Sequence, residues 1–250
     1  MRAWWPVVRD DAGYRQVMGE ARYDDVAATY GVGPDDYSVG ATAALVELVG
    51  DVRGLRVADL ACGHGPIARE LGRRGAAVVG VDLSDALIQE ARAREVSEPL
   101  GIDYVVADVS STDTLQGEQF DLLVCNFGLS DIDDLDGCCA TASRLLVSGG
   151  AFVWSILHPC FPGGAGVSGS WPSDGSYQHE GWWRADGEHS GLRQVVGAHH
   201  RRVSTYVNTM GRHALFVDAV AEPGPEHRLR TRSPELATVP LYLVIRCSTP

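Results

Sequence analysis

A short apolar strand that runs into a glycine turn constrains the fold of this chain more than any other feature. The segment VADLACGHG, residues 57–65, joins apolar residues to two glycines, and Pro66 follows it directly. Glycine lets a backbone turn tightly and approach a ligand closely, while proline suits the first position of a helix. A strand, a glycine turn and a helix in this order predict the first unit of an α/β domain with a mainly parallel sheet.

Strand-like and helix-like segments alternate after residue 51, as βαβ units require. We expect strands at 56–60, 77–81, 102–107, 120–125 and 151–157, and helices between them at 66–74, 85–96 and 133–146. Ser84 is expected to cap the second helix, and Gly149 and Gly150 to end the third. Helices at 14–30 and 37–49 should form an N-terminal cap (1–50), and a helix at 203–213 should precede last strands at 215–221 and 241–246.

The segment 158–198 departs from this alternation. It is rich in Gly, Ser, Pro, Trp and His and has no periodic apolar pattern, so we interpret it as a substrate lid inserted into a single domain, 1–250. Its aromatic residues could enclose a flat or cationic small molecule, or could simply fasten a long loop to the domain. They are Phe161, Trp171, Tyr177, Trp182 and Trp183.

A polar residue follows each of the first four expected strands. Because the carboxyl ends of parallel strands meet at one crevice, these side chains should converge. They are Asp59, Asp82, Asp108 and Asn126. The Asp82 carboxylate has two oxygens that match the two hydroxyls of a ribose diol. The Asp108 carboxylate could accept a hydrogen bond from an exocyclic amine.

Two cofactor classes use a glycine turn of this kind. The spacing of Gly63, Gly65 and Ala68, with Asp82 further on, also satisfies the loose pattern for a dinucleotide. Asp59 separates the two interpretations, because a carboxylate beside the turn repels a pyrophosphate but suits a cationic amino group. S-adenosylmethionine carries an ammonium group and NAD does not. The residues therefore favour S-adenosylmethionine, with an NAD(P)-dependent oxidoreductase as the alternative.

Four motifs in order along the chain resemble those of the class I S-adenosylmethionine-dependent methyltransferases. They are VADLACGHG, VVGVDLS, VVADVSS and FDLLVCNFGLSDIDD, and LLVSGGAFVWSILHP is similar to the fifth-strand segment of that family. The resemblance runs from about residue 14 to the end of the chain. It implies a Rossmann-like seven-stranded, mostly parallel sheet in the order 3214576 with helices on both faces. It also implies S-adenosylmethionine as cofactor and S-adenosylhomocysteine as product.

The resemblance further implies a role for each matching residue. The methionine and ribose portion would lie against Asp59, Ala61, Cys62, Gly63 and Gly65, the ribose hydroxyls against Asp82, the adenine among Leu83, Asp108, Val109 and Phe127, and the sulfonium near Asn126. Tyr23 and Tyr30 would lie over the carboxylate or the methyl group, or else occupy core positions of an amphipathic helix.

Catalysis from a sulfonium needs little from the protein beyond alignment of the acceptor, with a base where the acceptor is a hydroxyl or an amine. Histidine is the natural base at neutral pH. His158 follows the fifth expected strand, and His199 and His200 follow the lid segment. The candidate catalytic residues are therefore His158, His200 and Tyr23.

The acceptor is expected to be a small molecule. The net charge of −12, from 33 acidic and 21 basic residues, repels a polyphosphate, so nucleic acid is an unfavourable partner. Asn126 is followed by Phe127 and Gly128, so the chain lacks the [DN]PP[FYW] motif of enzymes that methylate bases or glutamine amides. We therefore expect methylation of a specialised metabolite at oxygen, nitrogen or carbon, with a non-catalytic S-adenosylmethionine-binding module as a further alternative.

The cysteines and the apolar pattern of the sequence bear on metal binding, thiol oxidation and cellular location. The six cysteines have irregular spacing and lie mostly in apolar runs, which favours reduced, buried thiols and no metal site. The sequence has no run of 18 apolar residues and no secretory leader pattern, so we expect a cytoplasmic protein without a membrane partner. A homodimer is one assembly that the sequence leaves open.

Overall fold

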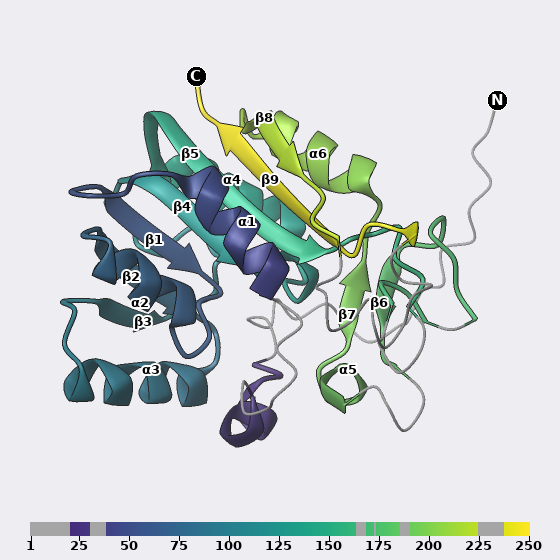
Figure 1. Cartoon of the computed structure of the whole chain (residues 1–250), viewed down its shortest axis with the longest axis horizontal. Helices are drawn as coiled ribbons and strands as arrows, with labels where there is room; N and C mark the ends of the chain where they lie inside the picture. The colour runs from purple at the N-terminus through teal and green to yellow at the C-terminus, as the bar shows by residue number, and fades with distance from the viewer. Residues whose placement is uncertain (1–20, 31–38, 164–168, 173, 186–190, 225–237) are drawn as a thin grey trace.

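The computed structural model describes residues 21–30, 39–163, 169–172, 174–185, 191–224 and 238–250. Within them, a seven-stranded sheet has the order β3-β2-β1-β4-β5-β9-β8 (Figure 1). Its strands are β1 (Arg56–Leu60), β2 (Ala77–Asp82), β3 (Asp103–Val106), β4 (Phe120–Asn126), β5 (Leu146–Leu157), β8 (Phe216–Ala221) and β9 (Tyr242–Ser248). The first five are parallel, and β9 runs antiparallel to both β5 and β8. This confirms the expected order, since β8 and β9 are the sixth and seventh strands of this sheet.

Helices cover both faces of the sheet because successive strand residues point to opposite sides. Val57 belongs to the apolar cluster that includes residues of α1 (Val39–Val49), α2 (Pro66–Arg73) and α3 (Asp85–Ser97). The next residue, Ala58, belongs to the cluster that includes residues of α4 (Leu135–Leu145) and α6 (Val203–Arg212). The central strands β1, β4 and β9 are buried on both faces over most of their length, as is typical of an α/β domain, whereas the edge strand β8 is largely exposed.

Two of the expected helix boundaries are correct, and one is wrong in detail. Ser84 caps α3 by accepting a hydrogen bond from the Leu87 backbone N–H at 3.2 Å, and Pro66 is the first residue of α2. Gly149 and Gly150, however, do not form a helix stop. They lie in the irregular first part of β5, which begins at the residue after α4 and shifts its register on β4 before Ala151. A φ of +74° at Gly149 accommodates this irregularity.

The N-terminal cap differs in part from the expectation. The second expected helix corresponds to α1, whereas residues 14–20 of the first lie outside the described residues. Residues 21–30 contain η1 (Asp24–Thr29), a short 3₁₀ helix, in place of the end of a long α-helix.

The lid segment carries more regular structure than its composition suggests. In it, β6 (Gly181–Trp183) pairs antiparallel with β7 (Ala198–His200), and α5 (Gly191–Val195) lies between them in the chain. We call β6 and β7 the lid hairpin. Strands of three residues are too short to produce a visible alternation, which explains why the pattern gave no sign of them. In Figure 1 the hairpin and α5 lie beyond the ends toward which β4 and β5 point.

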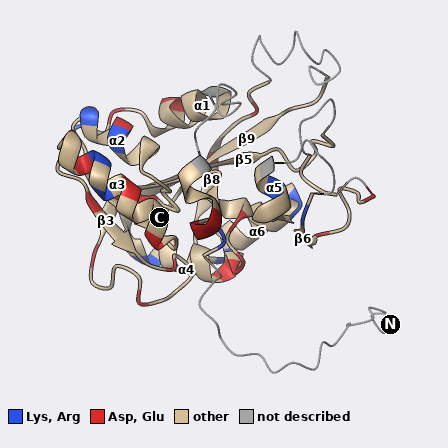
Figure 2. Cartoon of the chain, turned by 90° about the horizontal axis from the view of Figure 1, so that it is seen from below, with Lys and Arg blue, Asp and Glu red and all other residues tan. Residues whose placement is uncertain are grey.

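The surface carries both signs of charge. Acidic and basic residues are interspersed over α2 and α3 (Figure 2), where Arg69 forms ion pairs with Glu95 and Glu98. None of the helices in the described part of the chain has the length and apolar character needed to cross a membrane.

Candidate functional site

Hydrogen bonds from its backbone N–H groups hold the glycine turn after β1 in place. Gly63 has φ +56° and donates its N–H to Asp82 Oδ2 at 2.7 Å, while the Cys62 N–H donates to the carbonyl of Val81 at 2.9 Å. These two bonds attach the turn to the end of β2. A Cβ at Gly63 would lie 3.5 Å from the Tyr30 ring, in ordinary van der Waals contact, so Tyr30 packs closely on this side of the turn.

Backbone conformation and close packing require small residues at Gly65 and Ala61. Gly65 has φ +85°, and a Cβ there would lie only 2.3 Å from the Tyr104 hydroxyl. Ala61 also has a positive φ, +55°, and its methyl group would meet any side chain placed at Gly128. Small residues at these positions therefore allow the turn to pack directly on β3 and on the segment after β4.

Asp59 is fully buried at the end of β1. Its Oδ2 accepts a hydrogen bond from the Ala68 backbone N–H at 3.0 Å, in the first turn of α2. Burial raises the pKa of Asp59 from its ordinary value to about 8. A carboxyl in this state is mostly protonated at pH 7 and becomes an anion when a cation binds beside it.

Asp82 and Asp108 lie at the ends of the two neighbouring strands. Asp82 Oδ1 accepts from the Ser84 N–H at 2.9 Å, and Asp108 Oδ1 accepts from the Ser110 N–H at 2.8 Å. Burial raises the pKa of Asp82 above its ordinary value, although its two backbone hydrogen bonds oppose this. The strand order places Asp59, Asp82 and Asp108 on adjacent strands, as the sequence predicts. Leu83 is half-buried and Val109 is buried next to these carboxylates in the chain.

Asn126 and Phe127 follow β4 and are held by their neighbours. The Asn126 side chain accepts from Ser155 Oγ at 2.6 Å and donates to Thr42 Oγ1 at 3.4 Å. Phe127 has φ +63° and its ring packs edge-on against Tyr242 at 5.8 Å. The end of β4 is therefore joined to α1, β5 and β9.

The segment 21–30 lies over the glycine turn. The Tyr30 ring packs edge-on against Tyr23 at 5.2 Å and against His64, a residue of the turn, at 5.5 Å. At the same time Asp24 accepts hydrogen bonds from Ser84 Oγ and from the Ala86 N–H at the start of α3. Tyr30 therefore packs on the turn and Tyr23 packs on Tyr30, and their expected position over the carboxylate or the methyl group stays a prediction.

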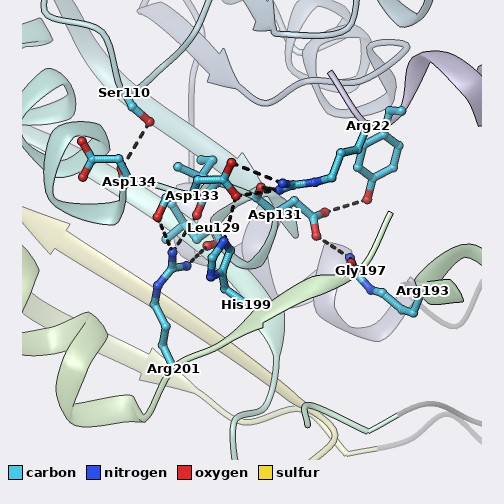
Figure 3. A network of polar contacts seen from close by, with 12 residues as sticks. Arg22, Ser110, Leu129, Asp131, Asp133, Asp134, Arg193, Gly197, His199 and Arg201 are labelled. Atoms are coloured by element: carbon cyan, nitrogen blue, oxygen red, sulfur yellow. Dashed lines mark hydrogen bonds and ion pairs between the residues drawn. The ribbon is translucent and has the colours of Figure 1, made fainter. Parts of the chain in front are cut away.

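Two aspartates after β4 each hold this segment and the lid segment together (Figure 3). Asp131 accepts from the Tyr23 hydroxyl at 2.6 Å and forms an ion pair with Arg193 of α5. Asp133 pairs with Arg22 at 2.9 Å and with His199 of the lid hairpin at 2.8 Å. We call Asp131 and Asp133 the bridging aspartates. Both the segment 21–30 and the lid segment are therefore attached to the loop after β4.

A pocket lies between the end of β5 and the lid hairpin. Its volume is about 330 Å³, including the part that is open to solvent. Ile156 and Leu157 of β5 form one wall, and Trp183 and His200 of the hairpin are on another. His200 is buried, and its Nε2 donates to the Tyr177 carbonyl at 3.0 Å.

His158 does not line this pocket, although Leu157 and Pro159 do. Its Nε2 donates to Glu222 Oε1 at 2.9 Å, and its Nδ1 accepts from the Cys160 N–H at 3.0 Å. Burial lowers the pKa of His158. Both ring nitrogens are therefore engaged in this arrangement, which leaves no lone pair for a substrate.

The five aromatic residues of the lid segment do not form one enclosure in the described structure. Phe161 is buried in the apolar cluster that includes residues of α1, and Trp182 is exposed, with the Arg184 guanidinium over its ring. Trp171 and Tyr177 pack against the His200 ring at 5.2 and 5.9 Å, while Trp183 lines the pocket. The five residues lie in different segments or, for Trp182 and Trp183, on opposite faces of one strand. The amino-acid composition gives no sign of this separation.

The sequence analysis missed several residues that the structure joins to the site. Asp131, Asp133 and Arg193 were not singled out, because ion pairs between distant segments leave no local pattern. Asp24 was also missed, although an acidic residue can cap a helix from elsewhere in the chain. Among the described residues, no group of three or more His, Cys, Asp or Glu side chains is arranged to hold a metal ion.

Comparisons with known proteins agree on one family. A family model described as a methyltransferase domain matches residues 58–154. The chain is 32% identical over 108 residues to a ubiquinone biosynthesis O-methyltransferase of Xanthomonas oryzae pv. oryzae (strain PXO99A), a match that covers 43% of this chain and 45% of that protein. The chain thus spans less than half the length of the curated relatives it matches.

Solved structures match over a larger part of the chain. An S-adenosylmethionine-dependent methyltransferase from Mesorhizobium loti is 30% identical, with a TM-score of 0.66, and the match covers 85% of this chain and 97% of that one. A structure described as a putative S-adenosylmethionine-dependent methyltransferase from Listeria monocytogenes has a TM-score of 0.68 at 24% identity, covering 85% and 98%.

Proposed function

Because the chain belongs to the class I S-adenosylmethionine-dependent methyltransferases, we propose that it transfers a methyl group to a hydroxyl oxygen of a small molecule bound under the lid. The observation that carries this proposal is the pocket between the end of β5 and the lid hairpin, in which the buried His200 lies. The names of the curated relatives support oxygen as the acceptor atom. The interpretation of the acceptor as a specialised metabolite stays a prediction.

The residues around the glycine turn fit the cofactor of this family. S-adenosylmethionine supplies a methyl group on a positively charged sulfur, and it also carries an ammonium group, a ribose diol and an adenine amine. Asp59 is a buried carboxyl without a cationic partner among its described hydrogen bonds, and we assign it to the ammonium group. We assign Asp82 to the ribose hydroxyls and Asp108 to the adenine amine. Each keeps acceptor capacity beyond its backbone hydrogen bonds, because each carboxylate oxygen accepts more than once.

The smaller residues complete this assignment. The turn would approach the methionine and ribose portion through Gly63, Gly65, Ala61 and Cys62, while Leu83, Val109 and Phe127 would border the adenine. Asn126, which Ser155 and Thr42 hold in place, would lie near the sulfonium. Tyr30 would cover the turn, where its ring is near Gly63.

Three residues were candidates for catalysis, and the contacts favour one of them. His200 Nε2–H donates a hydrogen bond to the Tyr177 carbonyl. In the neutral ring, Nδ1 therefore carries a lone pair that can accept a proton from a hydroxyl. His158 uses both ring nitrogens in other contacts. Tyr23 donates to Asp131, and burial raises the pKa of Tyr23 well above its ordinary value, so it is not suited to act as a base. We therefore propose His200 as the base.

Two measurements test the proposed function. Calorimetric titration with S-adenosylmethionine and with NAD should show binding of the first only, and tight binding of NAD alone would instead support an oxidoreductase. Incubation with S-adenosylmethionine and a panel of hydroxylated small molecules should then release S-adenosylhomocysteine. Binding without turnover across a broad panel would favour a non-catalytic module. His200→Phe should lower turnover while leaving cofactor affinity unchanged.

A further inference from the structure

Trp183 and His200 lie on the same face of the lid hairpin. In the register of β6 and β7, Trp183 is opposite Ala198, and His200 is opposite Gly181. Residues two apart on a strand share a face, so Trp183 and His200 are diagonal neighbours. Diagonal Cβ atoms are about 7–8 Å apart or somewhat less, which large side chains can span. Since Gly181 has no side chain, it leaves the space opposite His200 open.

Each of these two side chains has one buried polar atom without a hydrogen-bond partner among the described residues. The atoms are Trp183 Nε1 and His200 Nδ1, and the exposed fractions of the two residues are 8% and 2%. The indole N–H can only donate. Because His200 Nε2 already donates to a carbonyl, its Nδ1 can only accept while the ring is neutral. A buried donor and a buried acceptor, on two residues that line the pocket, therefore lack partners among the described residues.

Other polar side chains around the pocket are already engaged. Arg193 binds Asp131 and the Gly197 carbonyl, and Arg201 donates to the carbonyls of Leu129, Ile132 and Asp133. The hydroxyl groups of Ser130 and Ser170 donate to backbone carbonyls at 3.2 and 2.6 Å. The two arginines are thus committed to holding the loop after β4, and neither is available to bind an anionic substrate.

We propose that Trp183 and His200 together recognise a hydroxyl group of an uncharged, flat substrate. The indole N–H donates to the hydroxyl oxygen, and His200 Nδ1 accepts the hydroxyl proton. This inference rests on the proposed function and adds to it the group that the pocket selects and a residue, Trp183, that selects it. A hydroxyl group both accepts and donates, whereas an ether or ketone cannot donate and an ammonium group cannot accept. An unmade hydrogen bond at either buried atom is costly, so the pair discriminates against those groups.

The walls of the pocket limit the rest of the substrate. Ile156, Leu157 and Pro159 line it opposite the hairpin, and Tyr206 also contributes. Apolar and aromatic surfaces of this kind favour a flat, apolar body around the hydroxyl group. Phenol, anisole and toluene are therefore suitable probes, because they share a ring and differ in what they can donate and accept.

A binding titration by NMR, on the protein saturated with S-adenosylhomocysteine, tests the pair directly. Phenol should bind more tightly than anisole, which can accept from Trp183 but cannot donate to His200, and anisole more tightly than toluene. Trp183→Phe should weaken phenol and anisole binding about 3- to 10-fold, the value of one hydrogen bond, and leave toluene binding unchanged. The indole N–H resonance of Trp183 should shift with phenol and anisole.

Trp182→Phe is the matched control, because Trp182 is the adjacent residue on the opposite face of β6 and is exposed. It should leave all three affinities unchanged. Phenol binding no tighter than toluene would mean that bound water alone satisfies both atoms, and would overturn the proposal. So would an equal loss for all three probes in Trp183→Phe. This titration does not depend on methyl transfer. A chain without methyltransferase activity could therefore still bind phenol preferentially, and an active chain could lack this preference.

Discussion

Asp59 is a fully buried carboxyl whose protonation state should depend on whether a cation is bound beside it. Its pKa is raised to about 8 by burial, whereas in the unfolded chain it should be close to 3.9. A group with a raised folded-state pKa contributes stability below its unfolded pKa, and that contribution is lost as the pH rises from about 4 to about 8. Binding of a cation reverses this preference, because the ion pair needs the carboxylate.

Cofactor binding should therefore release a proton. At pH 6.5, calorimetry of S-adenosylmethionine binding in two buffers with different ionisation enthalpies should show release of up to about one proton, with affinity rising toward pH 8. Asp59→Asn should remove this proton release and weaken binding. If the wild-type protein released no proton, Asp59 would be a helix cap for α2 and would not bind the ammonium group.

Gly65 gives a second prediction at the scale of the residue. Gly65→Ala combines a φ of +85° with a contact of 2.3 Å to the Tyr104 hydroxyl, so we expect a loss of about 2 to 4 kcal/mol in the free energy of unfolding. Gly101→Ala is the matched control, because Gly101 has φ +78° with nothing within 4 Å of the added Cβ. Urea denaturation should show the larger loss at Gly65, and equal losses would mean that Tyr104 moves aside easily.

At the scale of the element, the bridging aspartates couple two segments that are far apart in the chain. Asp131→Asn removes the charge that pairs with Arg193 and that accepts from Tyr23. We expect hydrogen exchange to accelerate in both 21–30 and 191–200, with a local loss of about 1–3 kcal/mol. The segment 21–30 and the lid segment should therefore loosen together.

A surface variant separates this coupling from a general loss of stability. Asp136, on α4, pairs with Arg212 on α6 and is exposed. Asp136→Asn should leave exchange in both segments unchanged, because exposed ion pairs contribute little. Faster exchange in the lid alone after Asp131→Asn would show that the two segments move independently.

For the whole molecule, the accessibility of thiols provides a test of the packing. Five of the six cysteines are buried and Cys160 is exposed. Burial also raises the pKa values of Cys125, Cys139 and Cys247, which makes them still less reactive. A thiol reagent should modify one cysteine in the native protein and six after denaturation, and Cys160→Ser should abolish the rapid reaction. A second rapid thiol would contradict the sheet packing described here.

The class of fold and the family can be predicted from the amino-acid sequence alone. Apolar segments at regular spacing and four motifs at the ends of strands predict the sheet order, because parallel βαβ units allow few alternatives. The same pattern placed Asp59, Asp82 and Asp108 at one edge of the sheet. Local signals were sufficient for these features, since each depends on residues close together in the chain, such as the Ser84 cap of α3.

The folded structure is needed to show how the site is covered and that His200, and not His158, lines the pocket. The lid hairpin depends on pairing between β6 and β7, and its strands are too short to leave a pattern. The bridging aspartates lie 108 and 111 residues from their partners Tyr23 and Arg22 in the chain, and no local spacing encodes such contacts. The engagement of His158 and the unpartnered nitrogen of His200 follow from hydrogen bonds to neighbours brought together by folding. Long-range contacts are set by the packing of the whole chain, so they can be read only from the folded molecule.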